Sequence, residues 1–174
     1  MEKLLIKGGK SLSGKIDCSG AKNAALPVIA ASILSSDDIT LKNLPFLQDI
    51  TTMFELIGSM GADISLDEKM NFKLNTSNLN NLEARYELVK TMRASILVLG
   101  SMVAKYGYAK IALPGGCAIG SRPVNYHLNA LEKLGAEISL ENGYIEAKAK
   151  KLIGSQIEFE GVTVTGTENL MMAA

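Results

Sequence analysis

The chain has 174 residues, of which 47% are hydrophobic, and its 18 basic and 18 acidic side chains give a formal net charge of zero. A chain of this length is typical of about one domain and is long enough to bury a sizeable core. Because a neutral chain with a pI near 6.6 lacks the positive field that steers proteins onto nucleic acid, nucleic acid is excluded as an expected partner.

The chain has only two cysteines and one histidine, which limits the kinds of disulfide, metal and catalytic site that it can form. Cys18 and Cys117 are too few for a disulfide framework and indicate a reducing compartment, so we expect a cytoplasmic protein. The single histidine, His127, leaves no histidine-based zinc site and makes a serine triad difficult to assemble, so we expect no metal. No cofactor is expected either. The first nine residues lack the apolar stretch of a signal peptide, so none is expected there. The apolar runs are shorter than the ~20 residues that cross a bilayer, so no membrane partner is expected.

The predicted elements begin with a helix over residues 24–34, which is rich in small and apolar residues. Cys18, in a strand-like stretch before it, is expected to be structural. Residues 54–60 have apolar side chains at helical spacing, and Gly61 follows the last turn before an acid and an Ile open a strand. The helix over 91–105 is apolar on almost every side, which predicts a helix inside the protein.

The pattern of residues 54–64 returns at residues 128–138, with the same order of helix, glycine and strand. A third copy begins at residue 166 and stops at Ala174 in an apolar helix without an end signal, so we expect a fragment of a longer protein. Repeats of this size imply stacked or pseudo-symmetric units.

Two predicted strands, over 145–150 and 157–165, alternate apolar and polar residues, with Gly161 shifting the register in the second. Sheets with one buried face argue against a doubly wound parallel sheet, whose strands are apolar on both faces. The fold class is therefore α/β (α+β), with buried helices and sheets on the outside. An ordinary two-layer α+β domain is the alternative, but it does not explain a helix that is apolar on every side.

The strongest local signal is the glycine-rich segment 114–123, PGGCAIGSRP. Its glycines let the backbone approach a ligand closely, and Pro123 opens a helix that runs to Leu134. Cys117 in this loop lies near Arg122 and a helix N-terminus, which favour a reactive thiolate. An inert buried cysteine is an equally open alternative, and a redox role is less favoured because no resolving cysteine is nearby in the sequence.

Positive charge stands at three helix starts, at Lys22, Arg93 and Arg122. The partial positive charge of a helix N-terminus disfavours cations there. A phosphate or carboxylate ligand removes this conflict because helix amides and side chains bind it together. Each cation taken alone has an alternative, which is to extend into solvent, and Asn23 beside Lys22 is either a ligand-binding residue or a helix cap.

Three segments resemble the UDP-N-acetylglucosamine 1-carboxyvinyltransferase family: SGAKNAALP at 19–27, KTMRASI at 90–96 and LPGGCAIGSRPV at 113–124. The resemblance runs from Lys7 to Ala174 and corresponds to the N-terminal part, less than half, of a family member. It implies an inside-out α/β barrel of repeated units.

This resemblance also implies a domain division. Residues 21–174 are the first enolpyruvyl transferase domain, truncated in its third repeat. Residues 1–20 are an opening strand segment that in the family packs on a second domain, which is missing here. A chain without that domain would expose apolar surface for self-association.

The activity that the resemblance implies is transfer of the enolpyruvyl group of phosphoenolpyruvate to the 3-hydroxyl of UDP-N-acetylglucosamine. Phosphate is released, in the first committed step of peptidoglycan synthesis. Lys22, Asn23 and Arg122 would bind phosphoenolpyruvate. Cys117 would be the general acid, form a covalent adduct and be the target of fosfomycin. The implied UDP-N-acetylglucosamine-binding residues are Arg93, Arg122, Pro123, Val124, Asn125, Tyr126, Gly161, Val162, Thr163 and Val164.

The chain departs from the family pattern at Asn125 and Tyr126, where the family usually has an acidic residue and Leu. It also ends before a catalytic aspartate and a second-domain arginine of the family, so we expect no turnover from this chain alone. One alternative is an enzyme like 5-enolpyruvylshikimate-3-phosphate synthase, against which Cys117 argues. The other is a non-catalytic domain that binds anions or nucleotide sugars.

Overall fold

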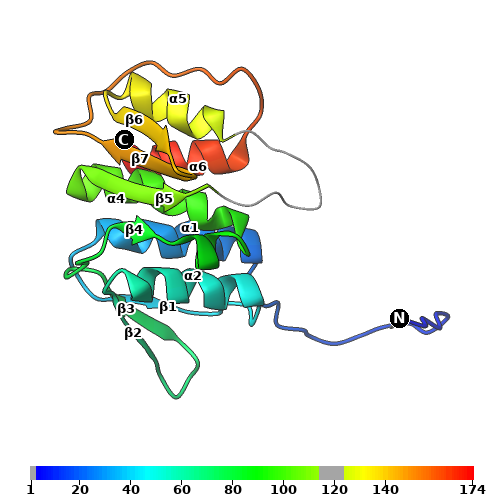
Figure 1. The fold of residues 1–174 in the computed structure, drawn as a ribbon. Helices are drawn as coiled ribbons and strands as arrows, with labels where there is room; N and C mark the ends of the chain where they lie inside the picture. Colours follow the sequence, from blue (N-terminus) through cyan, green and yellow to red (C-terminus); the bar gives the residue numbers. More distant parts are fainter. Residues whose placement is uncertain (1–2, 114–123) are drawn as a thin grey trace.

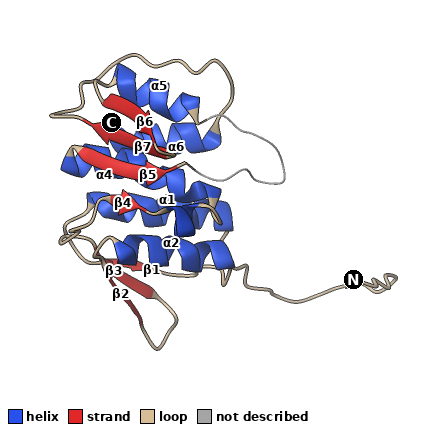
Figure 2. Ribbon diagram, viewed as in Figure 1, coloured by secondary structure: helices blue, strands red, loops and turns tan. Residues whose placement is uncertain are grey.

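The computed structural model describes residues 3–113 and 124–174, and Figure 1 shows their fold. Its centre is formed by three helices that pack on one another: α1 (Lys22–Ala31), α4 (Val98–Tyr106) and α6 (Val164–Ala173). The strands form two separate sheets outside these helices: one lies against α4, and the other lies next to α2 (Gln48–Ser59), as Figure 2 shows. The prediction of buried helices with sheets on the outside is therefore confirmed.

The first unit combines α1 with a small antiparallel sheet that packs against α2. Its further elements are η1 (Ser32–Leu34), β1 (Ile39–Leu41), α2 (Gln48–Ser59), β2 (Asp63–Leu66) and β3 (Phe72–Asn75). The sheet order is β1-β3-β2, and β3 pairs with both neighbours in antiparallel register.

The second unit repeats this arrangement around α4. Its other elements are β4 (Glu83–Ala84), α3 (Tyr86–Val89), η2 (Arg93–Leu97), β5 (Tyr108–Ala112), α5 (Asn125–Lys133), β6 (Glu137–Glu141) and β7 (Tyr144–Lys148). The sheet order is β4-β5-β7-β6, in which β5-β7-β6 has the antiparallel pairing of β1-β3-β2 and β4 adds a parallel edge.

The sequence repeat is thus a structural repeat. Gly61 follows α2 with φ +107° and Gly135 follows α5 with φ +90°, a backbone region that favours glycine, before β2 and β6 begin. In β7, Ile145 and Ala147 are buried, as their alternation with polar residues predicts.

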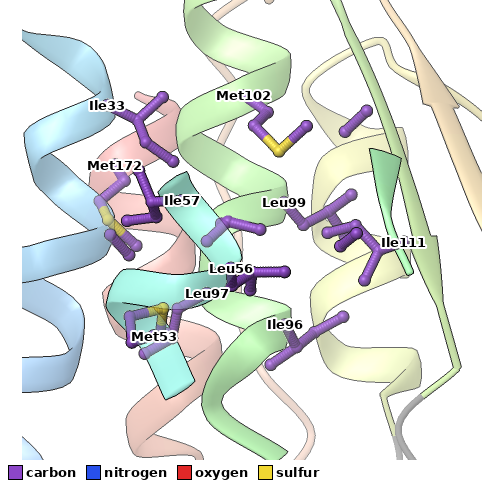
Figure 3. Packing of buried hydrophobic residues seen from close by; sticks show 14 of the residues in the cluster. Ile33, Met53, Leu56, Ile57, Ile96, Leu97, Leu99, Met102, Ile111 and Met172 are labelled. Carbon is purple, nitrogen blue, oxygen red and sulfur yellow. The ribbon is translucent and has the colours of Figure 1, made fainter. Parts of the chain in front are cut away.

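The core is aliphatic and continuous across the units. Figure 3 shows side chains of one apolar cluster that come from α2 (Leu56 and Ile57), α4 (Leu99) and α6 (Met172). Every residue of α4 from Val98 to Val103 is buried, as expected for a helix that is apolar on all sides. The helix predicted over 91–105 is instead a 3-10 helix, η2, that leads into α4, and Ser95 Oγ donates to Met92 O at 2.7 Å at its start.

The predicted strand over 157–165 is wrong. The described structure has no strand there, and Val162 is fully exposed. A strand needs a paired neighbour, whereas Thr163 caps α6 by accepting a hydrogen bond from the Gly166 amide at 3.1 Å. The alternation of apolar and polar residues over 157–165 therefore predicted a strand where there is none, and Val164 is instead the first residue of helix α6.

Residues 3–20 extend away from the helices and carry no strand (Figure 1). Their apolar side chains are exposed, and Cys18, expected to be structural, is exposed as well. The packing of this segment on a second domain stays a prediction. No helix among the described residues is both long and apolar enough to cross a membrane.

Candidate functional site

An open cavity of about 450 Å³ lies where η2, α5 and α6 begin. Its lining comes from three segments that are far apart in the sequence and that the fold brings together. They are Arg93, Ala94 and Ile96 of η2, Val124, Tyr126 and His127 at the start of α5, and Val162, Thr163, Val164 and Thr165 at the start of α6.

Local sequence explains how two of these walls are fixed. Thr163 caps α6, and Gly166 leaves room for that cap because a Cβ at residue 166 would lie 2.6 Å from the Thr163 methyl carbon. The Tyr126 ring packs edge-on against Phe159, with ring centroids 6.1 Å apart. The Tyr126 hydroxyl also faces the Gly161 backbone, because a Cβ there would lie 3.0 Å from the hydroxyl oxygen.

The structure brings together most of the residues predicted to bind UDP-N-acetylglucosamine. Those lining the cavity are Arg93, Val124, Tyr126, Val162, Thr163 and Val164. Gly161 adjoins Tyr126, whereas Asn125 is exposed and is not part of the lining. Arg122 and Pro123, and with them the predicted catalytic Cys117, lie outside the described residues.

The residues predicted to bind phosphoenolpyruvate, Lys22 and Asn23, are not part of this lining. Lys22 begins α1, and its Nζ lies 2.8 Å from Asp49 Oδ2 in the first turn of α2. Both side chains of this ion pair are partly exposed, at 44% and 33%. Such a pair contributes at most about 1 kcal/mol, so an arriving anion can compete for Lys22. Sequence reasoning missed Asp49, although its place in the first turn of a helix was the available signal.

His127 is the other residue of the site that sequence reasoning left without a role in binding. It is only 4% exposed, and its Nδ1 lies 2.9 Å from the Asn169 amide nitrogen. Burial, followed by the positive charge of Arg93, lowers the pKa of His127 from 6.5 to about 4, so the imidazole is neutral at pH 7. The signal that could have revealed its partner is Asn169 itself, a polar residue at helical spacing from the apolar Met172 and Ala173.

The arrangement can bind a ligand that has both an anionic and a flat part. Arg93 offers a guanidinium, which matches phosphate oxygens, and the α6 N-terminus adds backbone amides. Tyr126 and the valines supply apolar contact area. Within residues 3–113 and 124–174, no group of His, Cys, Asp and Glu side chains is arranged to hold a metal ion.

Comparison with curated proteins gives close relatives. The chain is 55% identical to a UDP-N-acetylglucosamine 1-carboxyvinyltransferase from Magnetococcus marinus. It is 53% identical to one from Hydrogenovibrio crunogenus. Both matches cover the whole chain, which spans 42% of the length of each relative.

Solved structures agree on the fold. The enolpyruvyl transferase NikO from Streptomyces tendae matches 84% of the chain and 32% of its own, with a TM-score of 0.67 and 24% identity. An EPSP synthase from Acinetobacter baumannii matches 95% of the chain and 39% of its own, with a TM-score of 0.70 and 16% identity. The family model for EPSP synthase (3-phosphoshikimate 1-carboxyvinyltransferase) matches residues 6–174. The chain therefore belongs to the EPSP synthase family of carboxyvinyltransferases.

Proposed function

We propose that this chain forms the nucleotide-sugar-binding part of an enzyme that transfers the enolpyruvyl group of phosphoenolpyruvate to the 3-hydroxyl of UDP-N-acetylglucosamine. The observation that carries the proposal is the cavity between η2, α5 and α6, whose walls come from three segments that the family resemblance implies for this ligand. The two curated relatives, which are named for this activity, support it.

Each wall of the cavity has a role in this proposal. Arg93 binds the diphosphate, together with amides at the start of α6. Tyr126, held by Phe159, packs its ring against the uracil, where Leu would give only apolar contact. Thr163 and the flanking valines close the opposite wall.

The chemistry falls to residues around phosphoenolpyruvate. Lys22, Asn23 and Arg122 bind its phosphate and carboxylate, so Lys22 exchanges Asp49 for the substrate. The Cys117 thiol protonates the methylene carbon, and the neighbouring carbon becomes electrophilic and accepts the sugar 3-oxygen, whose proton passes to a base supplied by the second domain. Loss of a proton from the new methyl group and of phosphate then restores the enol ether. The same thiol is the proposed site of the covalent adduct and of fosfomycin attack.

The biological role follows from this reaction. We place it in the cytoplasm, at the first committed step of peptidoglycan synthesis, and hence in cell-wall growth and cell division. Its partners are the two small-molecule substrates and a second domain that completes the site, so this chain alone has no turnover.

Isothermal titration with UDP-N-acetylglucosamine tests the proposal. Arg93→Met should weaken binding by about tenfold or more, because a charge-assisted contact to phosphate is lost. Arg85→Met is the matched control, since Arg85 is exposed before α3 and is not part of the cavity lining, and it should bind as the parent chain does. Circular dichroism checks that both variants fold.

Shikimate 3-phosphate is the comparison ligand, because the matching family model is that of EPSP synthase. It should not compete with the nucleotide sugar. Equal binding of UDP-N-acetylglucosamine by the two arginine variants would contradict the proposal. Tighter binding of shikimate 3-phosphate than of UDP-N-acetylglucosamine would also contradict it and would favour the reaction of EPSP synthase.

A further inference from the structure

A buried hydrogen-bond network joins the three elements that form the cavity walls. Its members are Ile96 O, the Gly100 amide, His127, Thr165 and Asn169, and we call it the Asn169 network. Asn169 is completely buried, and Met172 and Ala173, one turn further along α6, are buried as well. Burying an amide among apolar side chains is costly unless every polar atom is hydrogen-bonded. The stability of the fold therefore depends on whether the side-chain amide of Asn169 finds hydrogen-bond partners.

The Asn169 side chain uses both of its polar atoms. Its Oδ1 accepts from the Gly100 amide at 2.6 Å, and its Nδ2 donates to Ile96 O at 3.1 Å. The same Nδ2 lies 2.9 Å from His127 Nδ1. Gly100 makes this approach possible, because a Cβ there would collide with Asn169.

These contacts fix the tautomer of His127. An amide nitrogen can only donate, so Nδ1 must be the acceptor and the imidazole proton must reside on Nε2. Nε2 lies 3.4 Å from Thr165 Oγ1, a hydroxyl that can accept that proton. The orientation of Asn169 is set independently, because its Oδ1 faces an amide and its Nδ2 faces a carbonyl.

The network is continuous with the candidate site. Ile96, His127 and Thr165 line the cavity, whereas Asn169 and Gly100 lie behind it. It therefore connects η2 and α4 to α5 and to the first turn of α6. An apolar contact at the same place would bury surface without fixing the position of one wall relative to another.

We propose that His127 and Asn169 are positioning residues for the nucleotide-sugar site, which hold the Arg93 turn and the start of α6 in the geometry that the ligand needs. This rests on the proposed function for the identity of the ligand. The network preforms the cavity, so the ligand does not have to order its walls on binding. Neither side chain takes part in the chemistry.

Electrostatics agree with a neutral imidazole. Arg93 is the charge that acts on His127, and together with burial it disfavours the imidazolium. The elements packed on α5 also carry Glu168, on α6, and Glu137 and Glu141, on β6. A protonated Nδ1 would lose the hydrogen bond from the amide and place two donors face to face.

Nitrogen NMR of the imidazole tests the geometry without any ligand. The chain has a single histidine, so its two ring nitrogens give an unambiguous pair of signals. We expect the pattern of a fixed Nε2–H tautomer, with no titration between pH 8 and pH 5.5. A ring that titrates near its ordinary pKa, or averages its two tautomers, would overturn the proposal.

Titration with UDP-N-acetylglucosamine tests the positioning role. His127→Leu should weaken binding by about tenfold at a temperature where the variant is folded, because its walls lose their fixed geometry. His127→Gln should recover most of the affinity, since a glutamine carbonyl can accept from Asn169 and its amide can donate to Thr165. A merely structural role would lower the melting temperature of His127→Leu and leave the affinity of the folded protein unchanged.

The two proposals fail differently. If the parent chain does not bind the nucleotide sugar, the proposed function is contradicted, and the ligand of this inference with it, even where the tautomer is as expected. If the parent chain binds and His127→Leu binds equally well, the proposed function stands and the positioning role is wrong.

Discussion

The buried imidazole of His127 couples the stability of the protein to pH. Its pKa is about 4 in the folded chain and 6.5 in the unfolded chain, so between these values the unfolded state binds more protons. The stabilising contribution is complete above pH 6.5 and is lost as the pH falls towards 4. We expect the free energy of unfolding to fall by about 2 to 3 kcal/mol through this group.

Urea denaturation at pH 7 and pH 4.5 measures this effect. Carboxylates also contribute to any acid slope, because hydrogen bonds lower the pKa of Asp67 and of Glu146. The difference between the parent chain and His127→Gln isolates the imidazole. Identical slopes for the two proteins would show that His127 is protonated in the folded state as easily as in the unfolded one.

Gly100 tests the packing around Asn169. Alanine at residue 100 would place a Cβ against the Asn169 side chain and backbone, so Gly100→Ala should destabilise the protein by about 1 to 3 kcal/mol. Gly58→Ala is the control, also within a helix, where the nearest atom, Ile64 Cδ1, is 3.6 Å away. It should stabilise by up to about 1 kcal/mol, because alanine is the better helix former. Thermal unfolding of both variants measures the two changes in stability. Equal changes for Gly100→Ala and Gly58→Ala would contradict the close packing of Gly100 against Asn169.

At the scale of elements, the turn after each of the two repeated helices, α2 and α5, depends on a glycine. Gly135 has φ +90° with nothing within 4 Å of its Cβ position, so Gly135→Ala introduces backbone strain without a clash. It should cost about 1 to 2 kcal/mol. Gly154→Ala also has open space around it, without a positive φ, and should be nearly neutral. Urea denaturation midpoints of the two variants, compared at an unchanged m-value, test this prediction. Similar midpoints for Gly135→Ala and Gly154→Ala would contradict a requirement for glycine at residue 135.

The sequence predicted the helices and their glycine ends because those signals are local. Helical spacing and Gly61 identified the end of α2, and the apolar surface of residues 91–105 identified an interior helix. The strand expected at 157–165 shows the limit of such signals. Alternation indicates exposure on alternate sides, but whether a partner strand is present depends on tertiary structure.

At the scale of the whole molecule, the site is a product of the repeat. The cavity lies where elements of the second unit meet α6, which occupies in the next unit the place of α1 and α4. Residue types and the family resemblance named most of its lining in advance. They did not give the Asn169 network, because no sequence pattern states that residues 100, 127 and 169 meet.

Fosfomycin labelling followed by peptide mapping tests the central claim most directly. With UDP-N-acetylglucosamine present, we expect modification of Cys117 and enhancement over the ligand-free chain, while the exposed Cys18 stays unmodified. Arg93→Met should require a higher concentration of the nucleotide sugar for the same enhancement, because this variant binds the nucleotide sugar more weakly. The same labelling is run on a longer protein that includes the second domain, and labelling of Cys117 only there would show that the site needs that domain. Failure to modify Cys117 in both proteins would contradict an enolpyruvyl transferase site and favour a non-catalytic binding domain.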